Sequence, residues 1–187
     1  MSLHGSLSQV FDPETLLVKG REARAEHRLV EAQELYAQAV AECRWVKNPP
    51  LLAKALNALG QVERDLHHSS TAIDCYRQAA AIYRELDAQV GLAHTIRHIA
   101  DILREQKRSA DAEKAYNEAL EIYRSNPDAP GLDLANALRG FALLKDGNGA
   151  GEEALLLWQE ASYLYAAAGV EAGVSECKMQ IAFLMGQ

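Results

Sequence analysis

The chain has 187 residues, of which 49% are hydrophobic and 24% are charged. This length allows one sizeable core or a short repeat array, and this composition excludes a disordered chain. No apolar run approaches the roughly 18 residues that span a bilayer, and Met1–Val10 lacks the basic and apolar pattern of a secretory signal. We therefore expect a cytoplasmic protein without a membrane segment. The net charge of −7 argues against nucleic acid as a partner, because phosphate binding needs clustered Lys and Arg.

Helix is expected almost throughout, because prolines are few and Ala, Leu, Glu and Arg are abundant. Asn48-Pro49-Pro50 ends one helix and begins the next, and 126–131 is a clear break. Ser69 and Ser109 are predicted N-caps. Residues 1–12 are expected to be flexible. In chain order, the predicted helices span about 13–27, 29–46, 50–67, 70–86, 90–107, 110–125, 132–146, 151–168 and 171–185.

The chain repeats a small, an aromatic and a small residue at i, i+4 and i+7, which lie along one helix face. The offsets between successive copies are 40, 40 and 42 residues. Another small residue stands twelve places before each copy and recurs a fifth time at Ala182. Small residues let helices approach closely while the rings fill the space between them, so the unit is a helix pair. The aromatic residues are Tyr36, Tyr76, Tyr116 and Trp158, and the preceding small residues are Gly20, Gly60, Ala100 and Ala142.

The same seam accounts for two further sets of side chains. Tyr83, Tyr123 and Tyr165 each follow a repeated aromatic by seven residues, and we expect them in the core rather than as stacking surfaces for bases. The three cysteines are odd in number and lack CxxC spacing, which disfavours a disulfide framework and favours a reducing compartment. We expect these thiols to be small core residues, and they are Cys43, Cys75 and Cys177.

This pattern resembles the tetratricopeptide repeat, in which a large apolar residue and Leu-Gly precede Ala, an aromatic residue and Ala. Leu56, 59–60, Ala72, Tyr76 and Ala79 occupy those places in one unit. The resemblance implies an all-α, right-handed α-solenoid of four helix pairs plus a C-terminal capping helix, in one domain over 13–187. The implied repeats cover about 13–47, 50–87, 90–126 and 132–168, and the cap covers 171–185.

The unit departs from the family's common length of about 34 residues, because it spans 40. It is similar to the longer variant of kinesin light chains and bacterial regulatory repeat proteins, where Tyr-Arg-Glu-Leu precedes Gly-Leu-Ala. Those motifs stand here at 83–86 and 91–93. The family's closing proline is replaced by Arg44, Arg84 and Arg124.

In the family that this chain resembles, the first helix of each pair lines a concave binding groove. The sixteen equivalent positions here hold seven Lys or Arg and three Asp or Glu, a balance of +4 in a chain of −7. Such a groove would attract an acidic peptide or protein segment, since arginine grips carboxylates at two points. The expected partner-binding residues are Arg21, Arg24, Lys54, Asn57, Arg64, His94, Arg97, Arg104 and Arg139.

A plainer interpretation of these arginines remains open. Repeated exposed Arg residues often pair with carboxylates of their own helix surface, and Asp65, Asp101 and Glu105 are near enough in sequence to neutralise them. The carboxylate-clamp pattern of chaperone-binding family members is not reproduced, because Leu17 stands where a lysine is expected. That activity is therefore not carried over.

Motifs of catalysis and of cofactor binding are missing from the sequence, so we expect no enzyme, cofactor or metal. The stretch 146–157 superficially resembles a calcium loop, but Ala150 and Leu157 stand where oxygen ligands are required. His94 and His98 have i, i+4 spacing for a shared metal, yet Arg97 between them would repel a cation.

The leading hypothesis is a protein-interaction scaffold that binds a peptide or protein partner. One alternative is self-assembly into a homo-oligomer through the C-terminal helix, where Phe183, Leu184 and Met185 make the capping helix unusually apolar. Another is an enzyme or a small-molecule sensor with a pocket in the groove, which only His94, Arg97 and Asp101 could form.

Overall fold

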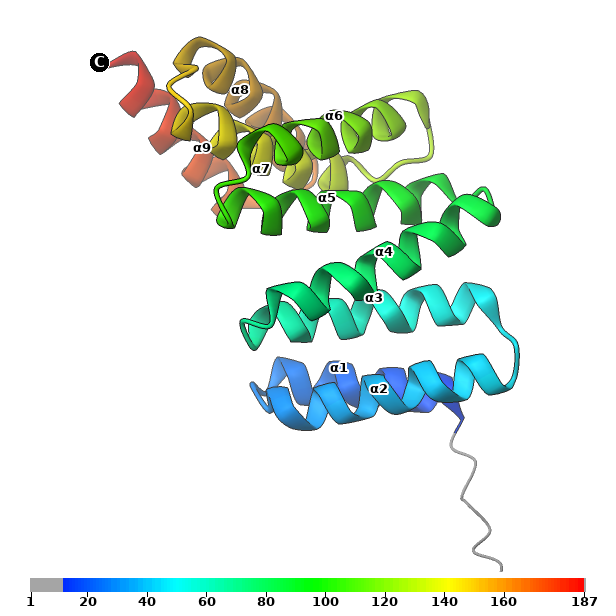
Figure 1. Ribbon diagram of the computed structural model, residues 1–187. Coiled ribbons are helices and arrows are strands. Elements are labelled where there is room, and N and C mark those ends of the chain that lie inside the picture. Colours follow the sequence, from blue (N-terminus) through cyan, green and yellow to red (C-terminus); the bar gives the residue numbers. More distant parts are fainter. Residues whose placement is uncertain (1–11, 187) are drawn as a thin grey trace, which may run out of the picture. The chain divides into compact units, whose positions relative to one another are not determined.

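The computed structural model describes residues 12–186, which form α-helices joined by short turns (Figure 1). Every predicted helix is present, with ends within two residues of those expected from the sequence. Residues 1–11 of the N-terminal segment that we expected to be flexible lie outside the described part of the chain. The helices are α1 (Pro13–Ala25), α2 (Leu29–Trp45), α3 (Pro49–Asp65), α4 (Ser69–Glu85), α5 (Gln89–Glu105), α6 (Ser109–Ser125), α7 (Gly131–Gly147), α8 (Gly151–Ala167) and α9 (Glu171–Met185).

Side chains cap the N-termini of α1 and α3, and the start of α3 at Asn48-Pro49-Pro50 agrees with the prediction. Asp12 caps α1, since its carboxylate accepts a hydrogen bond of 2.9 Å from the backbone N–H of Thr15. Asn48 caps α3, since its side-chain oxygen accepts a hydrogen bond of 3.2 Å from the backbone N–H of Leu51. A proline follows each of these two caps. The predicted N-cap roles of Ser69 and Ser109 are wrong, because each serine is the first residue of its helix. Arg108 occupies the cap position of α6 without a side-chain hydrogen bond.

The turns after several helices place an ordinary L-residue in the left-handed region. In the first of them, His27 has a φ of 59°, and the N–H of Arg28 donates to the carbonyl of Ala23 at 2.8 Å. Such bonds satisfy the last carbonyls of a helix and reverse the chain tightly. Glycine takes the left-handed position later in the chain, at Gly149 with φ 79° and at Gly169 with φ 70°. Gly149 thus serves the turn between α7 and α8. The non-glycine residues with positive φ are His27, Lys47, His67, Asp87 and Lys107.

The chain divides into two compact units at a boundary within α4, between Ile82 and Tyr83, and each unit is described on its own. In the first unit, glycines on the first helices receive tyrosine rings from the second helices. A Cβ on Gly20 would lie 2.5 Å from the ring of Tyr36, and one on Gly60 would lie 2.9 Å from the ring of Tyr76. Only glycine allows this approach, which explains the small residue at this place in the repeat.

The second unit, from Tyr83 onward, buries its aromatic residues in the same register. Tyr116 and Trp158 are fully buried, and the ring of Tyr116 stacks on that of Phe141 with centroids 5.5 Å apart. Tyr123 and Tyr165 are 2% and 3% exposed, which confirms that this tyrosine series is core.

The three cysteines are buried free thiols, as expected. Burial raises the pKa of Cys75 and of Cys177 to about 11, which keeps both thiols protonated and unreactive at neutral pH. Among the described helices, none combines the length and the apolar character that crossing a membrane requires.

Candidate functional site

The predicted partner-binding residues lie on the first helix of each helix pair, and these first helices are α1 and α3 in the first unit and α5 and α7 in the second. In the first unit, Arg24 on α1 reaches across to α3, where its Nε donates to the carboxylate of Asp65 at 2.7 Å. Its Nη1 donates to the amide oxygen of Gln61 at 3.2 Å. The Arg24 guanidinium therefore joins α1 to α3, the first helices of successive pairs. Its charge is balanced by Asp65, one of the acids that the sequence suggested could neutralise these arginines.

The other predicted residues of the first unit differ in accessibility. Arg21 and Lys54 are exposed, and Arg64 is half-buried. Asn57 is only 8% exposed, so its amide belongs to the interior between helices. Among the predicted partner-binding residues of this unit, the fully exposed cations are thus Arg21 and Lys54.

In the second unit, Asp101 on α5 is the centre of a buried polar cluster. Its side chain is 10% exposed, and its Oδ2 accepts a hydrogen bond of 3.0 Å from Nη1 of Arg97, whose side chain is 11% exposed. Its Oδ1 accepts one of 2.6 Å from the Tyr116 hydroxyl on α6. A carboxylate buried to this degree needs such partners, since an unpaired charge away from water is very costly.

The cluster continues through two histidines of α5. Nη2 of Arg97 lies 2.9 Å from Nε2 of His98, and that nitrogen lies 3.2 Å from Nε2 of His94. Arginine can only donate, so Nε2 of His98 accepts the hydrogen bond from Arg97. Nδ1 of His94 lies 3.7 Å from Oδ1 of Asp133 on α7. The nearby His94 imidazole is the main reason why the pKa of Asp133 lies below its ordinary value.

Arg139 on α7 connects this face to α9. Its Nε and Nη2 each donate to a different oxygen of Glu176 at 2.7 Å, which is the two-point geometry that guanidinium and carboxylate groups favour. This bonding raises the pKa of Arg139 further above its ordinary value. One turn earlier, Asn136 accepts a hydrogen bond of 2.8 Å from the hydroxyl of Tyr165. Burial raises the pKa of Tyr165 to about 12.

Arg104, the remaining predicted residue of the second unit, lies one turn beyond Asp101 on α5. Its side chain is 25% exposed, and Nη2 lies 3.7 Å from the Glu105 carboxylate. The structure thus brings His94, Arg97 and Arg139 into one polar face of the second unit, while Arg104 lies toward the end of α5.

Sequence reasoning missed the polar roles of Tyr116, Tyr165 and Asp133. The tyrosines were correctly expected in the core, but a buried ring can still present its hydroxyl to a polar group. One signal was available. Gly140 stands inside α7, where glycine is unfavourable, and a Cβ there would lie 2.7 Å from the Tyr116 hydroxyl and 2.8 Å from Asp101 Oδ1. A glycine inside a helix pointed to a close approach at this position.

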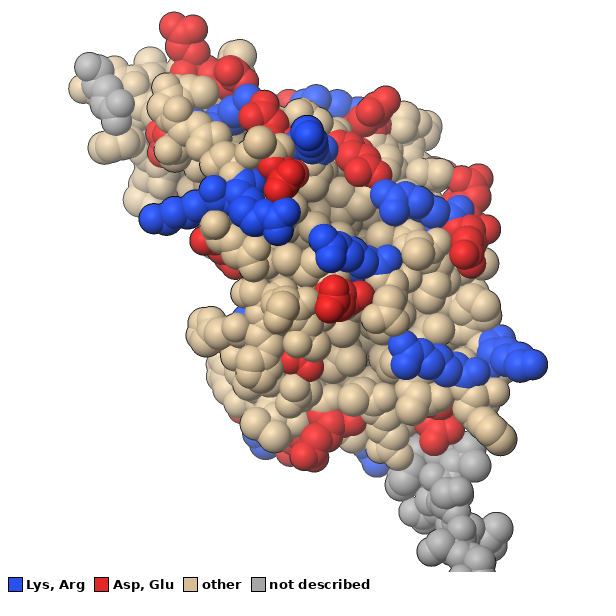
Figure 2. All heavy atoms as spheres, viewed as in Figure 1, with Lys and Arg blue, Asp and Glu red and all other residues tan. Residues whose placement is uncertain are grey.

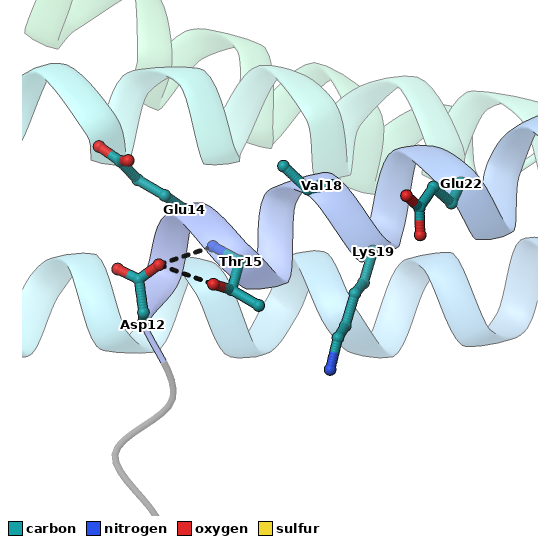
Figure 3. Close-up of a pocket in the computed structure, with 6 residues that line it drawn as sticks. All are labelled: Asp12, Glu14, Thr15, Val18, Lys19 and Glu22. Carbon is teal, nitrogen blue, oxygen red and sulfur yellow. Dashed lines mark hydrogen bonds between the residues drawn. The ribbon is translucent and has the colours of Figure 1, made fainter.

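The surface hollows offer little enclosure. One of about 440 Å³ lies along α1 and is lined only by residues of that helix and its N-cap, including Thr15, Val18 and Lys19 (Figure 3). Another of about 460 Å³ follows the end of α8 and the start of α9, around Val170 and Lys178. Within the described part of the chain, no group of three or more His, Cys, Asp or Glu residues could hold a metal ion.

The fold is that of TPR-like helical-repeat proteins. The structure of RapI in its apo form superposes with a TM-score of 0.84 at 14% identity, over 95% of this chain and 66% of that one. A Rap protein complexed with Competence and Sporulation Factor gives 0.78 at 16% identity, over 92% of this chain. The TPR-like repeats of a putative kinesin light chain from Podospora anserina give 0.67 at 15% identity, over 93% of this chain and 96% of that one.

This chain spans about half (48%) of the Rap protein solved with Competence and Sporulation Factor. Comparison with protein-family models found no match, and comparison with curated proteins found none.

Proposed function

We propose that this chain is a non-catalytic protein-interaction scaffold of the cytoplasm, which binds a peptide or protein segment on the first-helix faces of its units. The observation that carries the proposal is the orientation of its arginines. Arg24 is held by the carboxylate of Asp65 on α3, and Arg139 by that of Glu176 on α9, each at 2.7 Å. A guanidinium held in this way keeps further N–H donors and loses little side-chain entropy when a ligand binds.

The charge of the proposed ligand follows from the accessible residues. Acids within the chain balance part of the arginine charge, and basic and acidic side chains alternate over the surface drawn in Figure 2. In the first unit, the exposed cations Arg21 and Lys54 on α1 and α3 favour an acidic segment. The Rap protein solved with Competence and Sporulation Factor supports the more general idea that this fold can hold a partner.

The test is a selection of random peptides displayed on phage, followed by affinity measurement at two salt concentrations. We expect peptides enriched in Asp and Glu, whose binding weakens at high salt. The double variant Arg21→Glu, Lys54→Glu should weaken binding at least tenfold. The matched control is Arg77→Glu, Lys114→Glu, which reverses the same amount of charge at exposed positions of second helices and should leave binding unchanged.

Three results would contradict the proposal. One is a selection that enriches no peptide, and another is equal binding by the two double variants. A third is enrichment of uncharged peptides, which would keep the scaffold and remove the acidic preference. Circular dichroism of each variant shows whether the helical fold is retained.

A further inference from the structure

Each second helix presents one row of four residues to solvent, which we call its outward stripe. The row takes the positions i, i+3, i+7 and i+10, which lie along one helix face. The residues at these positions are exposed on α6, which another helix pair follows, just as they are on α8, so the position itself faces solvent. The stripes are Glu34, Ala37, Ala41 and Arg44 on α2, Asp74, Arg77, Ala81 and Arg84 on α4, Lys114, Asn117, Glu121 and Arg124 on α6, and Leu156, Gln159, Tyr163 and Ala166 on α8.

The outward stripe of α8 differs from the others because it carries no charge. The stripe of α2 has two charged residues, and those of α4 and α6 have three each. On α8, Leu156 is 66% exposed and Tyr163 is 75% exposed, whereas the other six tyrosines of the chain are buried. Exposed apolar side chains that stand together within a polar surface mark a site of interaction.

Negative charge borders this stripe at the N-terminal end of α8. Glu152 and Glu153 are both exposed, and Glu152 lies one turn before Leu156. Nζ of Lys145 lies 2.7 Å from the carboxylate of Glu153 and 2.7 Å from that of Glu113, so one cation serves two acids. With Glu152, the acids at this end of the stripe outnumber the cation that balances them.

We propose that the outward stripe of α8 binds an amphipathic helix of a partner protein, whose apolar side chains cover Leu156 and Tyr163 and whose Lys or Arg residues meet Glu152 and Glu153. Leu156 and Tyr163 are two helical turns apart, so a helix that lies along α8 can cover both with one apolar face. The excess of acid at one end of the stripe determines the sign of the partner's charge.

The same charges disfavour two other occupants. Gly151–Ala167 contains three glutamates and no Lys or Arg, so an anionic lipid surface would be repelled. A second copy of α8 would add its own glutamates to the interface and would offer them no cation. A basic helix removes the apolar area from water and also neutralises the acids.

This site is separate from that of the proposed function. It lies on a second helix and takes a basic ligand, whereas the proposed function uses cations on first helices for an acidic one. Either proposal can therefore fail without the other.

The probe is a stapled, fluorescently labelled helical peptide with the 17-residue length of α8. It has Leu at i, i+3, i+4 and i+7 on one face and Lys at the other positions. Fluorescence anisotropy should show saturable one-to-one binding of this Leu/Lys peptide to the intact protein. A Leu/Glu peptide with the same apolar face should bind at least tenfold more weakly, because its charges meet those of Glu152 and Glu153.

Two double variants locate the apolar part of the site. Leu156→Gln, Tyr163→Gln removes the apolar side chains of the stripe without adding charge, and it should weaken binding of the Leu/Lys peptide at least tenfold. The matched control is Val30→Gln, Trp45→Gln, which removes apolar side chains that are 61% and 79% exposed on α2 and should leave binding unchanged. All four positions are exposed, so circular dichroism should show an unchanged helical content.

A pair of single variants tests the charge. Glu152→Gln should weaken binding of the Leu/Lys peptide about threefold, as expected for one exposed ion pair. Glu34→Gln removes an exposed glutamate from the outward stripe of α2 and should have no effect.

Four outcomes would overturn the proposal. The first is no binding of the Leu/Lys peptide, or equal binding of the Leu/Glu peptide. The second is binding that survives Leu156→Gln, Tyr163→Gln. The third is a concentration-dependent dimer in sedimentation that this double variant abolishes, which would make a second copy the occupant. The fourth is co-sedimentation with vesicles of phosphatidylcholine and phosphatidylglycerol that the same variant abolishes, which would make a lipid surface the occupant.

Discussion

The two units bury one carboxylate each on a first helix and direct it to different neighbours. In the first unit, Glu63 of α3 is 5% exposed and accepts a hydrogen bond of 2.8 Å from the Gln33 amide on α2. Its other oxygen lies 2.8 Å from Nδ1 of His68, in the turn before α4. In the second unit, Asp101 of α5 is 7% exposed and bonds to Arg97 and Tyr116.

The difference shows that one repeat framework can place buried charge in two ways. Glu63 ties a first helix to the preceding second helix and to a turn, which is a role in folding. Asp101 lies beside the arginine and histidines that form the polar face of the second unit. The repeat determines where side chains are buried, and small changes of position along the helix decide which partners a buried acid meets.

Removing the Asp101 carboxylate should have the largest effect. In Asp101→Ala, the buried Arg97 guanidinium and the Tyr116 hydroxyl lose their common acceptor, so we expect a loss of about 3 kcal/mol in the free energy of unfolding. Urea denaturation measures it. The control Asp111→Ala removes an exposed carboxylate that is paired only with Arg108, and it should cost about 0.5 kcal/mol. Equal losses in the two variants would mean that the buried cluster is not special.

The close glycine contacts give the next largest effect, and they test both units. In Gly60→Ala, the new methyl group would press on the ring of Tyr76, and in Gly140→Ala on the Tyr116 hydroxyl. We expect each to lower stability by about 1–3 kcal/mol. A Cβ on Gly147 would meet nothing within 4 Å, so Gly147→Ala should raise stability by about 0.5 kcal/mol. Thermal unfolding measures these changes. If Gly147→Ala lowered the stability as much as Gly60→Ala and Gly140→Ala do, the close contacts of Gly60 and Gly140 would not explain the losses.

Alkaline pH should weaken the fold through its buried tyrosines. Burial raises the pKa of Tyr116, Tyr123 and Tyr165 in the second unit, and of Tyr36 in the first. A raised pKa means that the folded state holds the proton more tightly. The stabilisation is therefore complete below about pH 10, the pKa of an unfolded tyrosine, and declines as the pH rises toward 12.

The measurement is urea unfolding at pH 8 and at pH 11. The wild type should lose stability between the two, and Tyr165→Phe should lose less, because it cannot ionise at that site. An unchanged pH dependence in Tyr165→Phe would show that the hydroxyl of Tyr165 does not carry this effect.

The smallest loss of stability should come from replacing the arginines that stand where the repeat family has its closing proline. These arginines link neighbouring second helices. In the second unit, Arg124 donates to the Glu160 carboxylate at 2.6 Å, and in the first, Arg44 donates to the neutral Gln78 amide at 2.8 Å. Because both sites are exposed, each Arg→Ala change should cost less than about 1 kcal/mol. The loss at Arg124 should shrink in 0.5 M salt, whereas that at Arg44 should not. The same salt response at both sites would show that the charge of the Glu160 carboxylate does not contribute to the stabilisation by Arg124.

Much of this protein was readable from one sequence, because the signals are local. The spacing of small and aromatic residues predicted the helix pairs, the buried tyrosines and the close contacts at Gly20 and Gly60. Side-chain size and helical period determine these features, and both can be read along a single helix.

What the sequence could not provide are the contacts between helices. Regular spacing treated Asn57 and Arg97 as equivalent, yet the amide is buried, and the guanidinium is held by a carboxylate that also meets Tyr116. Such bonds depend on rotamers and on how closely neighbouring helices approach, which a repeat of 40 residues does not determine. The sequence by itself determined the helical repeat and its core. Only the tertiary structure decided which charges are paired and which polar side chains are buried, because both properties depend on how pairs of helices pack.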